Sequence, residues 1–279
     1  MTLTVLSTGV LTTVQDRGRR GFARLGVPRA GALDAPAAAL ANRLVGNGPD
    51  AAVLEVTLGG LSFRAEIGVW IAVTGARAPL RVDGEARDND RPERVPAGSV
   101  ASLGAPSSSV RSYVAVSGGI EVAPVLGSRS TDTLAWVGPS PVAAGAVLPL
   151  GIATEPRPLD TPPVRRAAGL RIHPGPRADW FVPDALDRLV ATAWSVEPAS
   201  DRIGLRLAGP ALPRLRTDEL ASEGMVLGAV QVPPSGRPIV FLADHPSTGG
   251  YPVIAVVEEA DLWQCAQARP GETIRFRAR

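Results

Sequence analysis

Short apolar runs alternate with turns rich in glycine and proline along most of this chain. Segments 70–76 and 113–119 are similar, since each is an apolar run that enters a turn of small residues. Apolar residues at 203, 205 and 207 follow the two-residue period of a β-strand. The 30 glycines and 27 prolines interrupt the chain too often for long helices. The pattern therefore predicts a mainly β protein made of short strands.

Three segments carry the signals of short helices. Asp34 can cap a helix over 35–44, which Gly46 would end. A second helix is expected to begin at Pro183-Asp184, and a third to span about 258–267.

A turn that leads into a strand recurs at 96–98, 144–145 and 270–271. Repeated closures of this kind suit β-barrels, because every strand needs a neighbour that covers its edge. The segment 154–168 is rich in proline and charge, with few apolar residues, and is typical of a linker. We therefore expect two β-barrel-like subdomains with a few short helices, over residues 1–153 and 169–279, joined by the Pro-rich linker 154–168.

Composition supports a folded and non-membrane chain. Of the 279 residues, 45% are hydrophobic and 20% charged, which allows a substantial core. No apolar run approaches the roughly 20 residues of a membrane span, and the first residues do not resemble a signal peptide, so a cytoplasmic location is expected. The net charge of +2 is spread along the chain and gives no reason to expect a nucleic-acid partner.

Two residue types narrow the chemistry further. All 29 basic residues are arginines, so the chain has no P-loop lysine for nucleotide phosphates and no lysine that could carry biotin. One cysteine and two histidines distant in sequence form no metal-binding pattern, so no metal is expected. Cys265 lies among apolar residues at helical spacing and is expected to be a buried, inert thiol.

The densest cluster of chemical groups is the loop 244–252, which lies between two apolar runs. His245 is the group in it whose ordinary pKa suits acid–base chemistry near neutral pH, and Asp244 or Asp132 could orient it or act in its place. The loop predicts a ligand-facing site. The alternative is a turn in which Asp and Thr side chains bind the local backbone.

Three further clusters combine arginine with acids, amides or hydroxyls. The segment 13–19 suits recognition of a carboxylate or phosphate, or holds a mere loop ion pair. Segment 127–132 could bind an oxyanion or ureido group, or cap a helix. In segment 200–207, Arg202 and Arg206 share one strand face, which is a ligand contact or a solvated surface.

In this order, the clusters resemble those of the allophanate-hydrolase-subunit-2-like family. That family includes subunits of bacterial 5-oxoprolinases and the matching half of the carboxyltransferase domain of urea carboxylases. The resemblance covers nearly the whole chain and is carried by the segments 15–19, 26–34, 42–47, 117–120, 127–132, 200–202, 228–233, 244–252 and 261–271. Unlike the family pattern, segment 136–148 has no Gly-Arg pair and no acidic residue.

The resemblance implies cyclophilin-like β-barrels and an allophanate hydrolase subunit 1-like partner. It also implies an active site near the junction of this chain with that partner. Asp16, Asp132, Asp244 and His245 are the candidate catalytic residues. The expected substrate-binding residues are Gln15, Arg17, Arg19, Arg129, Thr131, Arg202, Gln231, Thr248, Gly249, Gly250 and Tyr251.

Three functions remain open at this stage. The first is a subunit of an ATP-dependent hydrolase that opens the lactam of 5-oxoproline; ATP then binds to the complex, which can include a LamB/YcsF-type protein. The second is the carboxyltransferase component of a biotin-dependent urea- or guanidine-type carboxylase, with biotin supplied on another chain. The third is a non-enzymatic regulatory or metabolite-binding protein.

Overall fold

The computed structural model describes residues 1–157 and 168–279, which form two compact units. Among the described residues, the first unit contains 1–19, 30–132 and 136–157, and the second contains 20–29, 133–135 and 168–279.

Most of the predicted linker 154–168 lies outside the described residues, so the linker and the domain bounds stay predictions. The short segments 20–29 and 133–135 belong to the second unit, although both come early in the sequence.

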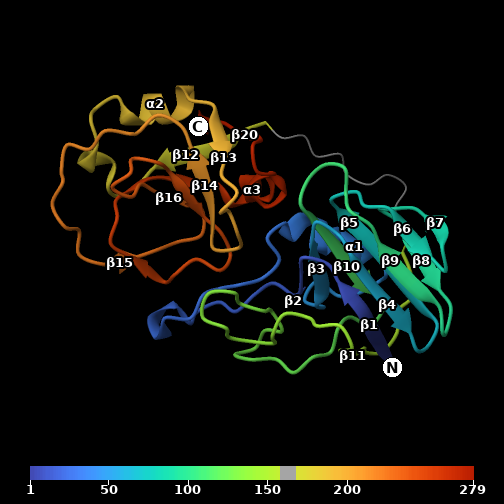
Figure 1. Cartoon of the computed structure of the whole chain (residues 1–279). Helices are drawn as coiled ribbons and strands as arrows, with labels where there is room; N and C mark the ends of the chain where they lie inside the picture. Colours follow the sequence, from blue (N-terminus) through green and yellow to red (C-terminus); the bar gives the residue numbers. More distant parts are fainter. Residues whose placement is uncertain (158–167) are drawn as a thin grey trace. The chain divides into compact units, whose positions relative to one another are not determined.

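Two antiparallel sheets make up the first unit (Figure 1). The six-stranded sheet has the order β11 (Val147–Pro149), β1 (Thr2–Thr8), β4 (Leu61–Ala65), β9 (Val100–Leu103), β6 (Leu80–Val82) and β7 (Glu85–Arg87). The five-stranded sheet has the order β2 (Leu11–Gln15), β3 (Val53–Thr57), β10 (Arg111–Val116), β5 (Val69–Gly75) and β8 (Pro92–Val95).

Both sheets contribute side chains to one core. Leu61, Phe63 and Ala65 alternate along β4 and are buried, and they share a cluster with Leu54 and Val114 of the other sheet. Side chains of one face of each sheet therefore pack together, as the two-residue period requires.

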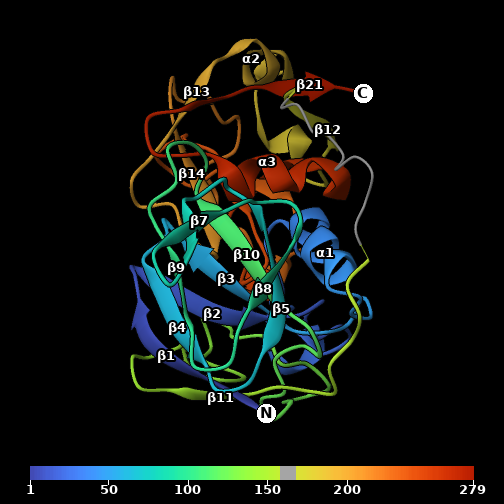
Figure 2. The same cartoon turned by 90° about the vertical axis from the view of Figure 1, so that its right-hand side faces the viewer.

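Helix α1 (Ala35–Leu44) covers the other face of the five-stranded sheet (Figure 2). The Asp34 carboxylate accepts a hydrogen bond from the Ala37 N–H at 3.0 Å, which caps the helix as predicted. Leu44 packs against Tyr113 and its neighbours, so both faces of β10 are covered and all six of its residues are buried.

The second unit is built on an eight-stranded sheet (Figure 1). Its order is β20 (Thr273–Ile274), β13 (Trp194–Val196), β14 (Gly204–Ala208), β17 (Ile239–Phe241), β16 (Ala229–Gln231), β19 (Val253–Val257), β12 (Leu170–Pro174) and β21 (Phe276–Ala278). The two end strands, β20 and β21, are separated in sequence by Arg275 alone, so the sheet curls round until its ends meet. The sheet is therefore a nearly closed barrel with short end strands.

The remaining elements of the second unit are short. A two-stranded sheet joins β15 (Glu223–Gly224) to β18 (Thr248–Gly249), and the helices are η1 (Ala23–Leu25), η2 (Ala178–Trp180), α2 (Ala185–Ala191), η3 (Glu259–Asp261) and α3 (Leu262–Gln267). The predicted helices after Pro183-Asp184 and over about 258–267 are confirmed.

The expectation of a mainly β protein with barrel-like subdomains and few short helices is confirmed. Cys265 is fully buried, and burial raises the pKa of its thiol to about 12, which makes it a poor nucleophile as expected. Within the described residues, no helix has the length and apolarity that crossing a membrane requires.

Candidate functional site

Asp16 joins two of the predicted clusters in the first unit. Its Oδ1 accepts hydrogen bonds from the Ser128 and Ser130 hydroxyls, both at 2.6 Å, and from the Gly18 N–H at 2.7 Å. Its Oδ2 accepts from the Arg129 N–H at 2.6 Å. Segments 15–19 and 128–131 are therefore held together by one carboxylate, whose role in this geometry is to position them.

Gln15 and Thr131 belong to the two segments that this carboxylate joins, and both side chains are almost fully buried. The Gln15 amide donates to the Thr13 hydroxyl at 3.0 Å and to the Thr131 carbonyl at 2.9 Å. The backbone adds a bond from the Thr131 N–H to the Val14 carbonyl at 2.9 Å.

Two polar atoms of this pair are left over. Gln15 Oε1 and Thr131 Oγ1 are buried without a hydrogen-bond partner in the described part of the chain. A buried polar atom without a partner costs about 1–3 kcal/mol, so such atoms mark places where a ligand or a water molecule binds. An amide oxygen can accept a hydrogen bond, and a hydroxyl can both donate and accept one.

The arginines of these two clusters are engaged elsewhere. Arg17 is exposed and pairs with Asp50 at 3.3 Å. Arg129 pairs with Glu121 and donates from Nε to the Val122 carbonyl at 2.9 Å. Arg19 is buried, and its guanidinium donates to the Ser130 carbonyl. Arg19 therefore supports the loop, while Arg17 and Arg129 each form an ion pair with a carboxylate of the same unit.

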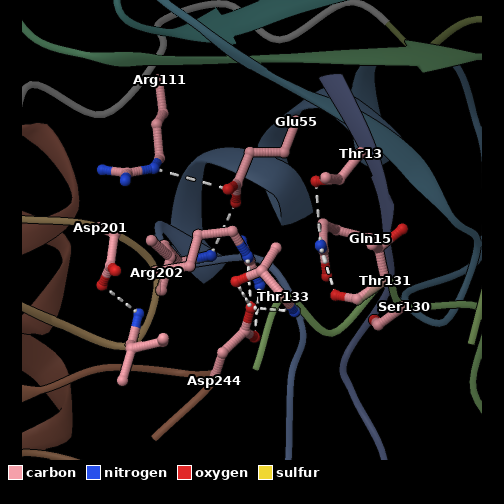
Figure 3. A network of polar contacts seen from close by, with 12 residues as sticks. Thr13, Gln15, Glu55, Arg111, Ser130, Thr131, Thr133, Asp201, Arg202 and Asp244 are labelled. Atoms are coloured by element: carbon pink, nitrogen blue, oxygen red, sulfur yellow. Dashed lines mark hydrogen bonds and ion pairs between the residues drawn. The ribbon is translucent and has the colours of Figure 1, made fainter. Parts of the chain in front are cut away.

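In the second unit, Arg202 and Asp244 form a buried two-pronged ion pair (Figure 3). The Arg202 Nε and Nη2 donate to the two carboxylate oxygens at 2.9 and 3.0 Å. Thr133 adds its N–H and its hydroxyl to Oδ2 at 2.9 and 2.7 Å. Asp244 thus fixes the start of the loop 244–252 and is a positioning group in this geometry.

Asp201 and Asp132 also form hydrogen bonds that hold the local backbone. The Asp201 carboxylate accepts from the Ile203 N–H at 2.8 Å and the Gly204 N–H at 3.0 Å, which is a turn-stabilising role (Figure 3). Asp132 is fully buried, and its N–H donates to the Val137 carbonyl at 3.1 Å.

His245 is the acid–base group of this loop. Its Nδ1 lies 2.8 Å from the Pro246 carbonyl oxygen, which can only accept, so Nδ1 carries the proton and neutral imidazole presents a lone pair at Nε2. Its ring stacks on Phe241 with centroids 5.9 Å apart. Burial lowers the pKa of His245, with Arg29 adding to the effect, while Pro246 and Asp244 oppose it. The ring is therefore neutral at pH 7 and suited to accept a proton.

The second half of the loop is more exposed. The Gln231 amide donates to the Tyr251 carbonyl at 3.1 Å, while the Tyr251 side chain is 45% exposed. A Cβ on Gly249 would lie 2.7 Å from the Gln231 amide nitrogen, so a larger residue there would displace the Gln231 side chain. Thr248 and Gly250 are exposed, so this part of the loop can be reached from solvent.

One buried network was missed from the sequence. Glu55 Oε2 accepts from the Tyr113 hydroxyl and the Leu33 N–H, both at 2.9 Å, and Glu55 Oε1 lies 3.5 Å from the Arg111 Nε. Burial, followed by the charges of Glu55 and Asp34, raises the pKa of Tyr113 well above its ordinary value. The available signal was a carboxylate in the middle of the apolar run 53–57.

The predicted site residues form a group in each unit. Gln15, Asp16 and Thr131 come together in the first, and Arg202, Asp244 and His245 in the second. Across residues 1–157 and 168–279, no three His, Cys, Asp or Glu side chains gather as a metal site would require.

Comparisons with known proteins show one family. A profile of the carboxyltransferase domain, subdomains A and B, matches residues 25–278. The C subunit of the 5-oxoprolinase of Escherichia coli K12 is 40% identical, over 98% of this chain and 90% of that protein. The urea amidolyase of Saccharomyces cerevisiae is 34% identical over 96% of this chain, which corresponds to 16% of that longer protein.

A solved structure agrees with these matches. The protein TTHA0988 superposes with a TM-score of 0.90 at 40% identity, over 99% of this chain. This chain spans 55% of TTHA0988.

Proposed function

Because the chain belongs to the carboxyltransferase-domain family, subdomains A and B, we propose that it is the C subunit of an ATP-dependent 5-oxoprolinase. The observation that carries the proposal is the similarity to a protein of that name over almost the full length of both chains. The reaction class is hydrolysis of a cyclic amide, 5-oxoproline to glutamate. The relative is named a subunit, which supports work within an assembly of several chains.

Each group of side chains offers chemistry that suits such a reaction. The Gln15 Oε1 can accept a hydrogen bond from the lactam N–H, and the Thr131 hydroxyl can contact the ring carbonyl. In the second unit, neutral His245 can act as a proton acceptor through Nε2. Asp16 holds its neighbours in place in the first unit, and the Arg202–Asp244 pair does so in the second. These contacts favour side chains that are already positioned for a substrate.

The absence of lysine limits what this chain can do with ATP or biotin. The sequence offers no P-loop lysine and no attachment point for biotin. We propose that the nucleotide contacts the complex through a partner, for which an allophanate hydrolase subunit 1-like protein and a LamB/YcsF-type protein are the candidates. Because such a complex would use ATP, we propose that it works in the cytoplasm.

The test is reconstitution of the complex. The chain is co-expressed with the subunit 1-like and LamB/YcsF-type proteins, and ATP-dependent release of glutamate from 5-oxoproline is measured. Activity with all components, and its loss when this chain is omitted, is expected. A folded H245A variant that keeps full activity would remove His245 from the mechanism.

A second function is favoured by the similarity to urea amidolyase. In that case the chain is the carboxyltransferase component of a biotin-dependent carboxylase, and the same preparation would transfer a carboxyl group from carboxybiotin to urea or guanidine. If neither assay shows activity, a non-enzymatic, metabolite-binding role would remain.

A further inference from the structure

Arg214 is a half-buried cation of the second unit that faces no carboxylate of the described residues. Two other arginines of this unit differ in this respect, since Arg177 pairs with Glu223 and Arg202 with Asp244. The Arg214 Nη2 donates to the Val232 carbonyl oxygen. Its Nε is buried and has no acceptor within residues 1–157 and 168–279.

The backbone on both sides of Arg214 is fixed. The Val182 N–H donates to the Pro213 carbonyl at 3.3 Å, and the Leu215 N–H donates to the Trp180 carbonyl at 2.8 Å. Arg214 itself forms a β-bridge with Phe181. The backbone from which the Arg214 side chain starts is therefore held in place on both sides.

The contacts of Arg214 lead to the loop 244–252. Val232 follows Gln231, whose amide donates to the Tyr251 carbonyl at 3.1 Å. Burial lowers the pKa of Arg214, and the Tyr251 phenol opposes this effect. A second buried atom without a partner in the described chain, Ser247 Oγ, lies in the same loop.

A guanidinium keeps its charge at any physiological pH, even when burial makes that charge unfavourable. The missing element is an anion, and the planar edge of a guanidinium matches a carboxylate or a phosphate. We propose that Arg214, next to the loop 244–252, forms a binding site for a small oxyanion, either a carboxylate or a phosphate group.

The experiment compares R214Q with R216Q in the full chain. Arg216 is a matched control, because it lies two residues away, exposed and over the Trp180 ring at 5.9 Å. Calorimetric titration at low salt uses three probes: inorganic phosphate, 5-oxoproline, and the uncharged lactam pyrrolidin-2-one. We expect R214Q to bind an anionic probe about tenfold more weakly than the wild type, as one lost charge-assisted pair implies. R216Q should stay within about threefold of the wild type, since it loses only a screened surface charge.

The probes identify the anion. Arg214-dependent binding of 5-oxoproline but not of phosphate assigns the site to a substrate carboxylate, and the reverse assigns it to a phosphoryl group; either supports the proposal. Anion binding by R214Q as tight as by the wild type, or no binding of either anion to the wild type, overturns it. If R214Q fails to fold, thermal unfolding of the wild type and of R216Q tests the proposal instead. The anion should raise the melting temperature of both proteins, and high salt should abolish this rise. Phosphate binding requires no lactam turnover, so its failure is distinct from failure of the proposed activity.

Discussion

The Thr131 hydroxyl illustrates what single residues reveal in this protein. It is buried without a partner in the described chain, whereas the Thr13 hydroxyl nearby accepts a bond from Gln15. The two threonines therefore have opposite effects on stability, although they differ little in burial.

A Thr131→Val substitution should leave the free energy of unfolding unchanged or raise it, because it removes an unsatisfied hydroxyl and keeps the shape. Thr13→Val should lower the free energy of unfolding by about 1 kcal/mol, because it removes a made bond. Denaturant unfolding measures both. In the reconstituted complex, T131V should also reduce kcat/KM for 5-oxoproline by about tenfold, the value of one hydrogen bond to the substrate. A T131V variant that is both destabilised and fully active would contradict this role.

His245 should make stability depend on pH. Burial lowers its pKa in the folded state below the ordinary value of 6.5, so the unfolded chain binds the proton more readily. This contribution to stability is present above pH 6.5 and is lost as the pH falls toward the folded pKa. His245→Asn keeps a donor near Nδ1 but cannot titrate, so the variant should lose less stability than the wild type between about pH 7.5 and about pH 5. Equal losses in denaturant titrations at the two pH values would exclude this role.

Sequence reasoning selected Gln15, Asp16, Thr131 and His245 because polar groups concentrated beside glycines at strand ends. It missed Thr133, which donates two hydrogen bonds to Asp244 from 111 positions away. Such a partner has no local signal, since any threonine in any loop could have filled the place.

At the scale of elements, two turns that connect the two sheets of the first unit pack against each other through glycines. Gly9 lies between β1 and β2, and Gly59 between β3 and β4. A Cβ on Gly9 would lie 1.9 Å from the Gly59 carbonyl oxygen. Gly84, between β6 and β7, has a similar positive φ of +83° but nothing within 4 Å of its added Cβ. A comparison of Gly9 with Gly84 therefore separates the cost of steric crowding from the cost of backbone strain, because both have a positive φ and only Gly9 is crowded.

Gly9→Ala should lower the free energy of unfolding by roughly 2–5 kcal/mol, the sum of left-handed strain and overpacking. Gly84→Ala should lower it by only about 1–2 kcal/mol. Chemical denaturation of the two variants gives the comparison, and equal effects would show that crowding at Gly9 is relieved at little cost.

Elements were the most predictable level of this structure. The helix over 35–44 begins at Asp34 and ends before Gly46, as caps dictate. Strand neighbours were not predictable, because pairing such as that of β10 with both β3 and β5 joins residues far apart in sequence.

At the scale of the whole molecule, closure of the second barrel depends on a few residues. β21 pairs with β12 in parallel, with Leu170 opposite Phe276, and Phe276 is almost fully buried. After β20 the chain turns so that β21 reaches β12, and no local pattern in the sequence predicts this turn. The inclusion of residues 20–29 in the second unit was equally hidden, since chain order suggested a division near 153.

Removal of residues 275–279 should open the second barrel, because it leaves the edge of β12 unpaired and deletes the Phe276 side chain. Hydrogen exchange should then show lost protection in β12 and β13, with β3 and β10 of the first unit unaffected. Removal of Arg279 alone is the control, since this residue is exposed and lies outside β21. Unchanged protection of β12 in the shortened chain would show that the sheet does not need its last strand.

The pairing of Leu170 with Phe276 also sets an order of events during synthesis on the ribosome. The first unit can fold as soon as β11 has emerged, because that strand completes its sheets. β12 must instead wait with both edges open, because its partners β19 and β21 are translated only later, the last of them roughly a hundred residues after β12. A nascent chain stalled in this interval exposes an edge that could pair with a neighbouring chain, so this is the stage at which a chaperone would matter most.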